Sequence, residues 1–118
     1  MTTVLVIEDE KNIRLFVVAN LEARAYKVLE AETGVQGLGL MRSVFPDVII
    51  LDMNLTDMTG ADVLFTMSQD DTLKNLPVIL MSAAIDTSDV DTYHNVVQRV
   101  VKPASIKTLL DAVQKITA

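Results

Sequence analysis

Acidic, hydroxyl and basic side chains stand directly after four short apolar runs of the sequence. Glu8 and Asp9 follow VLVI, Asp52 follows VIIL, Ser82 follows PVILM and Lys102 follows RVV. An aspartate that ends a buried apolar run loses hydration at a large cost unless a partner pairs with it. Asp52 therefore requires a cation or a hydrogen-bonding partner close by.

The residue types at these positions suit phosphoryl chemistry supported by a metal ion. Three neighbouring carboxylates repel one another unless a cation neutralises them, and hard oxygen ligands favour Mg²⁺ over zinc. A carboxylate beside such a cation can attack a phosphoryl donor and become an aspartyl phosphate. Lys102 would stabilise the charge on the transferring phosphoryl oxygens, and the Ser82 hydroxyl would hydrogen-bond one of them.

These side chains must be positioned by the ends of strands. Val- and Ile-rich runs predict strands, and three of the five are continuous rather than alternating, which is typical of a parallel sheet buried on both faces. The predicted strands cover residues 4–7, 27–31, 48–51, 77–81 and 99–101. Apolar residues at helical spacing predict helices at 13–21, 38–45, 63–67, 90–97 and 106–116, with Ile13, Phe16, Val17 and Leu21 on the buried face of the first.

Strands and helices that alternate five times predict a doubly wound α/β fold with right-handed crossovers. In such folds ligands bind outside the carboxyl ends of the strands, near the switch in strand order. We therefore expect the polar residues after the first, third, fourth and fifth strands to share one site.

Length and composition limit the classes of function. A chain of 118 residues indicates one domain, and the absence of cysteine fits a reducing compartment such as the cytoplasm. The N-terminal MTTVLVIEDEKN resembles neither a signal peptide nor a membrane span. A net charge of -6 argues against direct binding of nucleic acid and favours a cation or a basic partner.

The ordered set of motifs resembles the receiver domains of two-component response regulators, including the chemotaxis-type single-domain receivers. The resemblance covers residues 1–118 and rests on these motifs: the pair Glu8-Asp9, Asp52 after PDVIIL, Gly60 eight residues later, Ser82 in LMSAA, and Lys102-Pro103. It implies a (βα)5 fold with the flavodoxin-like strand order 2-1-3-4-5.

The resemblance also implies a role for each residue of the site. Asp52 would accept a phosphoryl group from a histidine kinase or a histidine phosphotransfer protein. Asp9 and Asp52 would ligate Mg²⁺ together with the backbone carbonyl of Asn54, and Glu8 would act through water. Two further side chains would hold the phosphoryl group: Ser82 and Lys102.

A receiver is a signalling domain rather than a metabolic enzyme. By resemblance, this chain would catalyse only its own phosphotransfer and autodephosphorylation. It would then control a partner or an attached output domain, as a monomer or as a weak phosphorylation-dependent dimer.

The sequence departs from the receiver pattern in the loop after Asp52 and around Lys102. Thr56 stands where receivers commonly have proline, and Arg99 stands where they usually have an aromatic switch residue. These departures leave open a docking module that works without phosphorylation. The segment from Asp52 to Thr56 also resembles the D-x-D-x-T motif of haloacid-dehalogenase-type phosphatases, but Asn54 cannot serve as the general acid/base that those enzymes need.

Overall fold

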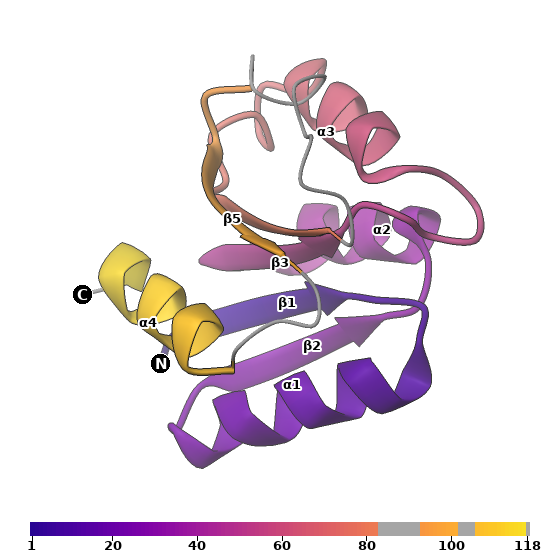
Figure 1. Ribbon diagram of the computed structural model, residues 1–118. Helices are drawn as coiled ribbons and strands as arrows, with labels where there is room; N and C mark the ends of the chain where they lie inside the picture. Colours follow the sequence, from indigo (N-terminus) through magenta and orange to yellow (C-terminus); the bar gives the residue numbers. More distant parts are fainter. Residues whose placement is uncertain (83–92, 102–105, 118) are drawn as a thin grey trace.

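The structure is a computed structural model that describes residues 1–82, 93–101 and 106–117 (Figure 1). Its strands are β1 (Thr3–Ile7), β2 (Lys27–Ala31), β3 (Val48–Asp52), β4 (Val78–Ser82) and β5 (Val96–Val101). The described helices are α1 (Lys11–Ala23), α2 (Gly34–Val44), α3 (Gly60–Ser68) and α4 (Ile106–Thr117).

All strands are parallel and form one sheet in the order β2-β1-β3-β4-β5, which confirms the predicted strand order. Every residue of β3 and β4 is buried, as the continuous Val, Ile and Leu runs predicted. The parallel arrangement brings the carboxyl ends of β1, β3 and β4 to one edge of the sheet. The polar residues after these strands therefore meet.

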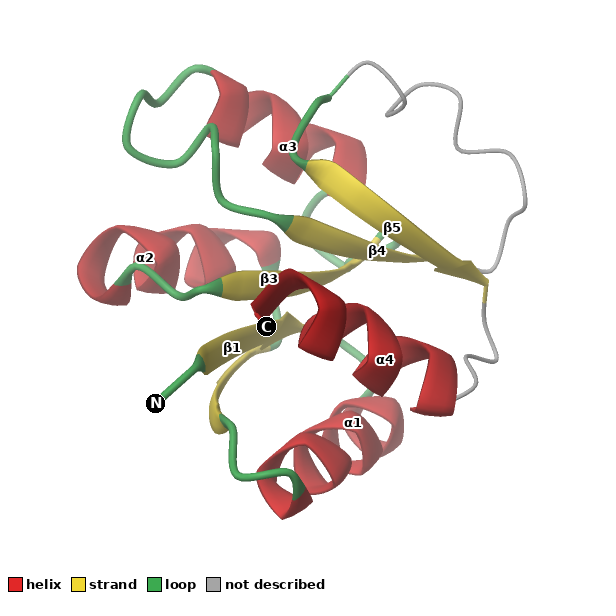
Figure 2. Cartoon of the chain, turned by 90° about the vertical axis from the view of Figure 1, so that its left-hand side faces the viewer, coloured by secondary structure: helices red, strands yellow, loops and turns green. Residues whose placement is uncertain are grey.

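Helices cover both faces of the sheet and give three layers (Figure 2). α1 and α4 pack on one face, against the residues of β1 and β3 that point to that face, such as Val6 and Ile50. α2 and α3 pack on the opposite face, against the next residues along the same strands, such as Ile7 and Leu51. Because successive residues of a strand point to opposite faces, one continuous apolar run supplies both cores.

The predicted helix at 90–97 is wrong where the structure describes it. Val96 and Val97 belong to β5, which pairs with β4. The segment Val96–Val101 reads VVQRVV, and valine stabilises a strand better than a helix because its branched Cβ restricts χ1. Positions 90–92 lie outside the described residues.

The predicted buried face of the first helix is partly wrong as well. Ile13 and Phe16 are 37% and 55% exposed, whereas the buried residues of α1 are Arg14, Val17, Val18 and Leu21. The buried set has the spacing i, i+3, i+4, i+7, and it begins with a charged residue. An apolar pattern could not identify that face, because its first member is an arginine.

Candidate functional site

The site begins at the adjacent ends of β1 and β3. Ile7 pairs in register with Leu51, so that Glu8 and Asp52 are the next residues on neighbouring strands. Asp52 pairs in turn with Met81, which places Ser82 at the end of the following strand. The structure thus brings together the ends of three strands at which the sequence predicted a site.

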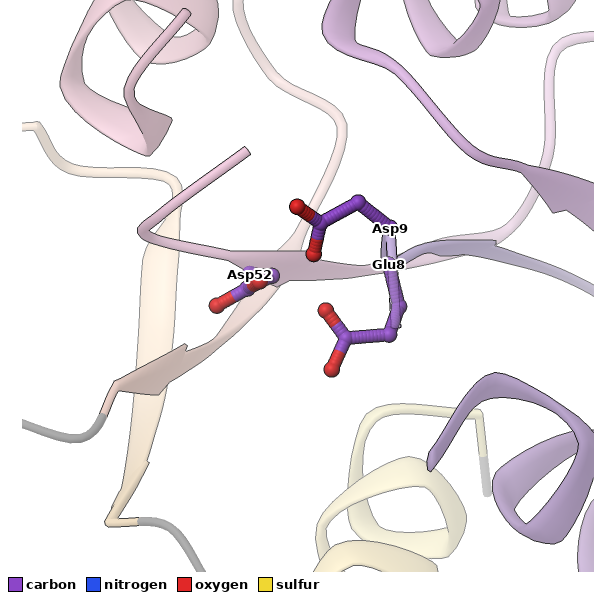
Figure 3. A group of neighbouring side chains, drawn as sticks. All are labelled: Glu8, Asp9 and Asp52. Atoms are coloured by element: carbon purple, nitrogen blue, oxygen red, sulfur yellow. The ribbon is translucent and has the colours of Figure 1, made fainter. Parts of the chain in front are cut away.

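The carboxylates of Glu8, Asp9 and Asp52 converge (Figure 3). One oxygen from each lies within 4.8 Å of the others. Glu8 is fully buried, Asp52 is 2% exposed and Asp9 is half-buried. Such close negative charges favour a bound cation, and three hard oxygen donors suit Mg²⁺. The donor set therefore fits the predicted metal.

Arg14 of α1 contacts the backbone of this acidic segment, and the sequence had not predicted the contact. Its Nη1 donates a hydrogen bond to the backbone carbonyl of Glu8 at 2.8 Å. Its Nε and Nη2 lie 3.2 and 3.4 Å from carboxylate oxygens of Glu30 and Glu32. Arg14 is only 6% exposed, so a buried guanidinium fixes the backbone that carries Glu8 and Asp9. The signal for it was the helical spacing of Arg14 with Val17.

Glu10, the third acidic residue of the run, has a structural function. Its side chain accepts a hydrogen bond of 2.7 Å from the backbone N–H of Ile13 and caps the N-terminus of α1. A carboxylate is favourable there because it satisfies an unpaired N–H and faces the positive end of the helix dipole. This cap fixes where the helix begins, directly after the acidic pair.

The loop after Asp52 folds back tightly on β3. The N–H of Gly60 donates to the carbonyl of Met53 at 2.7 Å, and Asn54 forms an antiparallel bridge with Thr59. A Cβ atom on Gly60 would lie 2.9 Å from the Met53 Cα atom and 3.2 Å from the Asp52 carbonyl oxygen. Glycine is required because backbone occupies this space. The backbone N–H of Asn54 lies 3.3 Å from the Asp52 carboxylate.

The tip of the same loop is attached to a different helix. The two carboxylate oxygens of Asp57 accept hydrogen bonds from the N–H groups of Gly34 and Val35 at the start of α2, at 2.9 and 3.0 Å. These bonds, first that of Gly34 and then that of Val35, hold the pKa of the Asp57 carboxyl below its ordinary value of 3.8. Local sequence gave no signal for this contact, because the partners are 23 and 22 residues apart.

The remaining predicted residues surround the carboxylates to different extents. Ser82 is 5% exposed at the end of β4 and pairs in register with Val101. Lys102 comes directly after Val101 but lies outside the described residues, so its position in the site stays a prediction. Arg99 pairs with Leu80 and is exposed on β5.

Together, the parallel 2-1-3-4-5 sheet and the carboxylates at the ends of β1 and β3 define a doubly wound α/β protein with its site at the topological switch point. Residues 4–114 match the profile of the response regulator receiver domain, and the chain belongs to this family. Phosphorylation on aspartate is the general function of the family. The match assigns the chain to receivers rather than to the haloacid-dehalogenase-type phosphatases.

Relatives and solved structures agree with this assignment. The transcriptional regulatory protein KdpE of Mycobacterium tuberculosis is 45% identical over 89 residues, which are 75% of this chain and 38% of KdpE. The chemotaxis response regulator CheY4 of Vibrio cholerae superposes with a TM-score of 0.90 at 26% identity, covering 98% of each chain. The response regulator TrrA of Thermotoga maritima, solved with Mg(2+)-BeF, has a TM-score of 0.82 at 27% identity, covering 98% of this chain and 99% of TrrA.

The chain thus spans well under half the length of the KdpE protein that it matches. Among the residues that the structure describes, no helix combines the length and the apolar character needed to cross a membrane.

Proposed function

We propose that Asp52 accepts a phosphoryl group from a histidine kinase or a histidine phosphotransfer protein in a reaction that requires Mg²⁺. The observation that carries this proposal is the convergence of the Glu8, Asp9 and Asp52 carboxylates within 4.8 Å. Membership of the receiver family supports it, and so does the Mg(2+)-BeF complex of TrrA.

In the proposed reaction an oxygen of the Asp52 carboxylate attacks the phosphorus atom of phosphohistidine. The new O–P bond forms as the N–P bond to the imidazole breaks, and the leaving nitrogen takes up a proton from water. Asp9, Asp52 and the backbone carbonyl of Asn54 would hold Mg²⁺, with Glu8 acting through water. When bound, the ion neutralises charge on the carboxylates and on the transferring phosphoryl oxygens.

Two further side chains would complete the site. The hydroxyl of Ser82 would donate a hydrogen bond to a phosphoryl oxygen from the adjacent end of β4. Lys102 would extend from the end of β5 and place its ammonium group beside another phosphoryl oxygen. In both cases the protein stabilises charge that develops during transfer, and neither residue has to move a proton.

The phosphorylated domain would then control a partner or an output domain. We propose that residues 1–118 form one receiver domain, either a monomer or a weak phosphorylation-dependent dimer. Its only catalysis would be its own phosphotransfer and autodephosphorylation. Arg99 occupies the position of the usual aromatic switch residue, and a guanidinium prefers water or a carboxylate to an apolar pocket. The output signal therefore requires another route than burial of an aromatic ring.

The test is phosphorylation of the purified chain by a small donor. The protein is incubated with Mg²⁺ and phosphoramidate, and its intact mass is measured with and without EDTA. We expect one added phosphoryl group that is absent in EDTA and absent in Asp52→Asn. If the wild-type protein gains no phosphoryl group under any of these conditions, the docking module without phosphorylation becomes the better account.

A further inference from the structure

The loop that follows Asp52, residues 53–59, is here called the acceptor loop. It contributes the Asn54 carbonyl to the proposed metal site. No proline occurs between Pro46 and Pro77, so no backbone φ angle in this loop is fixed by a ring. Its shape therefore depends on the contacts that hold its base and its tip.

The base of the acceptor loop is closed by its own backbone. The Gly60 N–H binds the Met53 carbonyl, and Asn54 faces Thr59 across an antiparallel bridge. These contacts set the width of the loop where it leaves the sheet. Separate contacts, made by Asp57, attach the tip of the loop to α2.

The tip is held on α2 by a carboxylate with two hydrogen bonds. Asp57 accepts from the Gly34 and Val35 N–H groups, while the Thr33 hydroxyl accepts from the Gln36 N–H at 3.1 Å. The first N–H groups of a helix have no partners within the helix and must find them elsewhere. The start of α2 is thus satisfied in two ways, by its own cap Thr33 and by a residue of the acceptor loop.

Side-chain packing reinforces this attachment. A Cβ atom on Gly34 would lie 2.5 Å from the Met58 Sδ atom and 2.6 Å from its Cγ atom. The Met58 side chain therefore rests directly against the bare backbone of α2, next to the hydrogen bonds of Asp57. Together Asp57 and Met58 join the tip of the loop to α2, whose Leu38 and Met41 are buried in the core against the sheet.

We propose that Asp57 is a positioning residue of the metal site: by tying the acceptor loop to the N-terminus of α2, it orders the backbone that presents the Asn54 carbonyl before Mg²⁺ binds. This inference rests on the proposed function, because Asn54 is a ligand only if the metal binds there. Ordering a loop costs conformational entropy, and a loop ordered in advance does not incur that cost upon binding. Residues that orient metal ligands commonly affect affinity about 10- to 100-fold.

The test compares the Mg²⁺ affinity of Asp57→Ala with that of Thr33→Ala, measured by calorimetric titration. Both variants remove a hydrogen-bond acceptor from the start of α2, but only Asp57→Ala detaches the acceptor loop. We expect Mg²⁺ binding about tenfold weaker in Asp57→Ala and changed less than about twofold in Thr33→Ala. Asp57→Asn should lie between wild type and Asp57→Ala, because its amide oxygen still accepts one hydrogen bond.

Two further measurements separate positioning from other effects. Removing a negative charge also weakens cation binding through space, but salt screens that effect. We expect the difference between Asp57→Ala and wild type to persist at high concentrations of KCl. In the metal-free protein, hydrogen exchange of the Gly34 and Val35 amides should accelerate in Asp57→Ala.

The possible results distinguish this inference from the proposed function. If wild type binds Mg²⁺ and Asp57→Ala binds it equally well, the positioning role is overturned and the phosphoacceptor site is unaffected. Equal losses in Asp57→Ala and Thr33→Ala would also overturn it, because they would indicate a general effect on α2. If wild type itself binds no Mg²⁺, both proposals fail. Asp57→Asn supplies the same comparison if Asp57→Ala does not fold.

Discussion

Arg14 offers the sharpest test of how the acidic segment is held. It is a buried cation on α1. Its guanidinium contacts the Glu8 carbonyl, Glu30 on β2 and Glu32 directly after β2. Arg14→Met keeps an unbranched apolar side chain of similar length and removes the charged guanidinium group. We expect this variant to unfold more readily, because the Glu8 carbonyl loses its charged donor.

The size of the effect follows from the exposure of each partner. The bond from Arg14 to the buried Glu8 carbonyl contributes about 1.5–3 kcal/mol, as expected for a hydrogen bond from a charged group. The side chains of Glu30 and Glu32 are 43% and 69% exposed, so solvent screens both ion pairs. They add at most about 1 kcal/mol together. Arg14→Met also removes the cost of burying a charged guanidinium, which offsets part of this sum. The expected loss of unfolding free energy is therefore about 2 kcal/mol.

Urea unfolding in EDTA measures this difference without any contribution from a metal. The matched control is Arg42→Met, since Arg42 is half-exposed and forms an ion pair with Asp70. We expect the control to lose less than about 1 kcal/mol. Arg14→Lys should lose most of what Arg14→Met loses, because an ammonium group cannot reproduce the planar fork. If Arg14→Met is as stable as Arg42→Met, the assignment of Arg14 as the support of this segment is wrong.

Two further predictions concern the backbone and the pH dependence. Gly60→Ala should destabilise the chain by about 1–3 kcal/mol, because its Cβ would meet backbone atoms of Met53 and Asp52. Gly39→Ala is the matched control: its Cβ would enter open space, so the change should stabilise α2 by about 0.5–1 kcal/mol. Equal thermal unfolding midpoints for these two variants would contradict the packing at Gly60. The Thr72 hydroxyl, followed by its backbone N–H and Arg42, lowers the pKa of Asp70 from 3.8. The ionised Asp70 carboxylate therefore stabilises the folded chain at pH values above 3.8, and this stabilisation is lost as the pH falls through the lower folded pKa. In acid unfolding, the difference in stability between wild type and Asp70→Asn should shrink below pH 3.8.

The sequence predicted the sheet and the carboxylate cluster because both depend on simple periodicities. Continuous Val and Ile runs identified β3 and β4, and parallel pairing necessarily brings the residues after β1 and β3 to one edge. The position of Asp52 could therefore be inferred without knowledge of any contact. The same reasoning places Lys102 directly after β5, and because Lys102 lies outside the described residues, its place in the site stays a prediction.

Other features depend on contacts that no local pattern encodes. The predicted helix at 90–97 failed because the valines of β5 satisfy helical and strand spacing equally well over such a short segment. The buried face of α1 was misjudged because Arg14 replaces an apolar residue there. The attachment of Asp57 to α2 joins residues more than twenty positions apart, so only the folded chain reveals it.

The central claim is that Asp52, and no other residue, carries the phosphoryl group. The most direct measurement is reduction of the phosphorylated protein with borohydride, which converts an aspartyl phosphate to homoserine, followed by tryptic mass spectrometry. Trypsin separates the candidates, since Asp9 lies in 1–11, Asp52 in 43–74 and Ser82 in 75–99. We predict homoserine at position 52 within the peptide 43–74. Homoserine at position 9, or a stable phosphate on Ser82, would contradict the account.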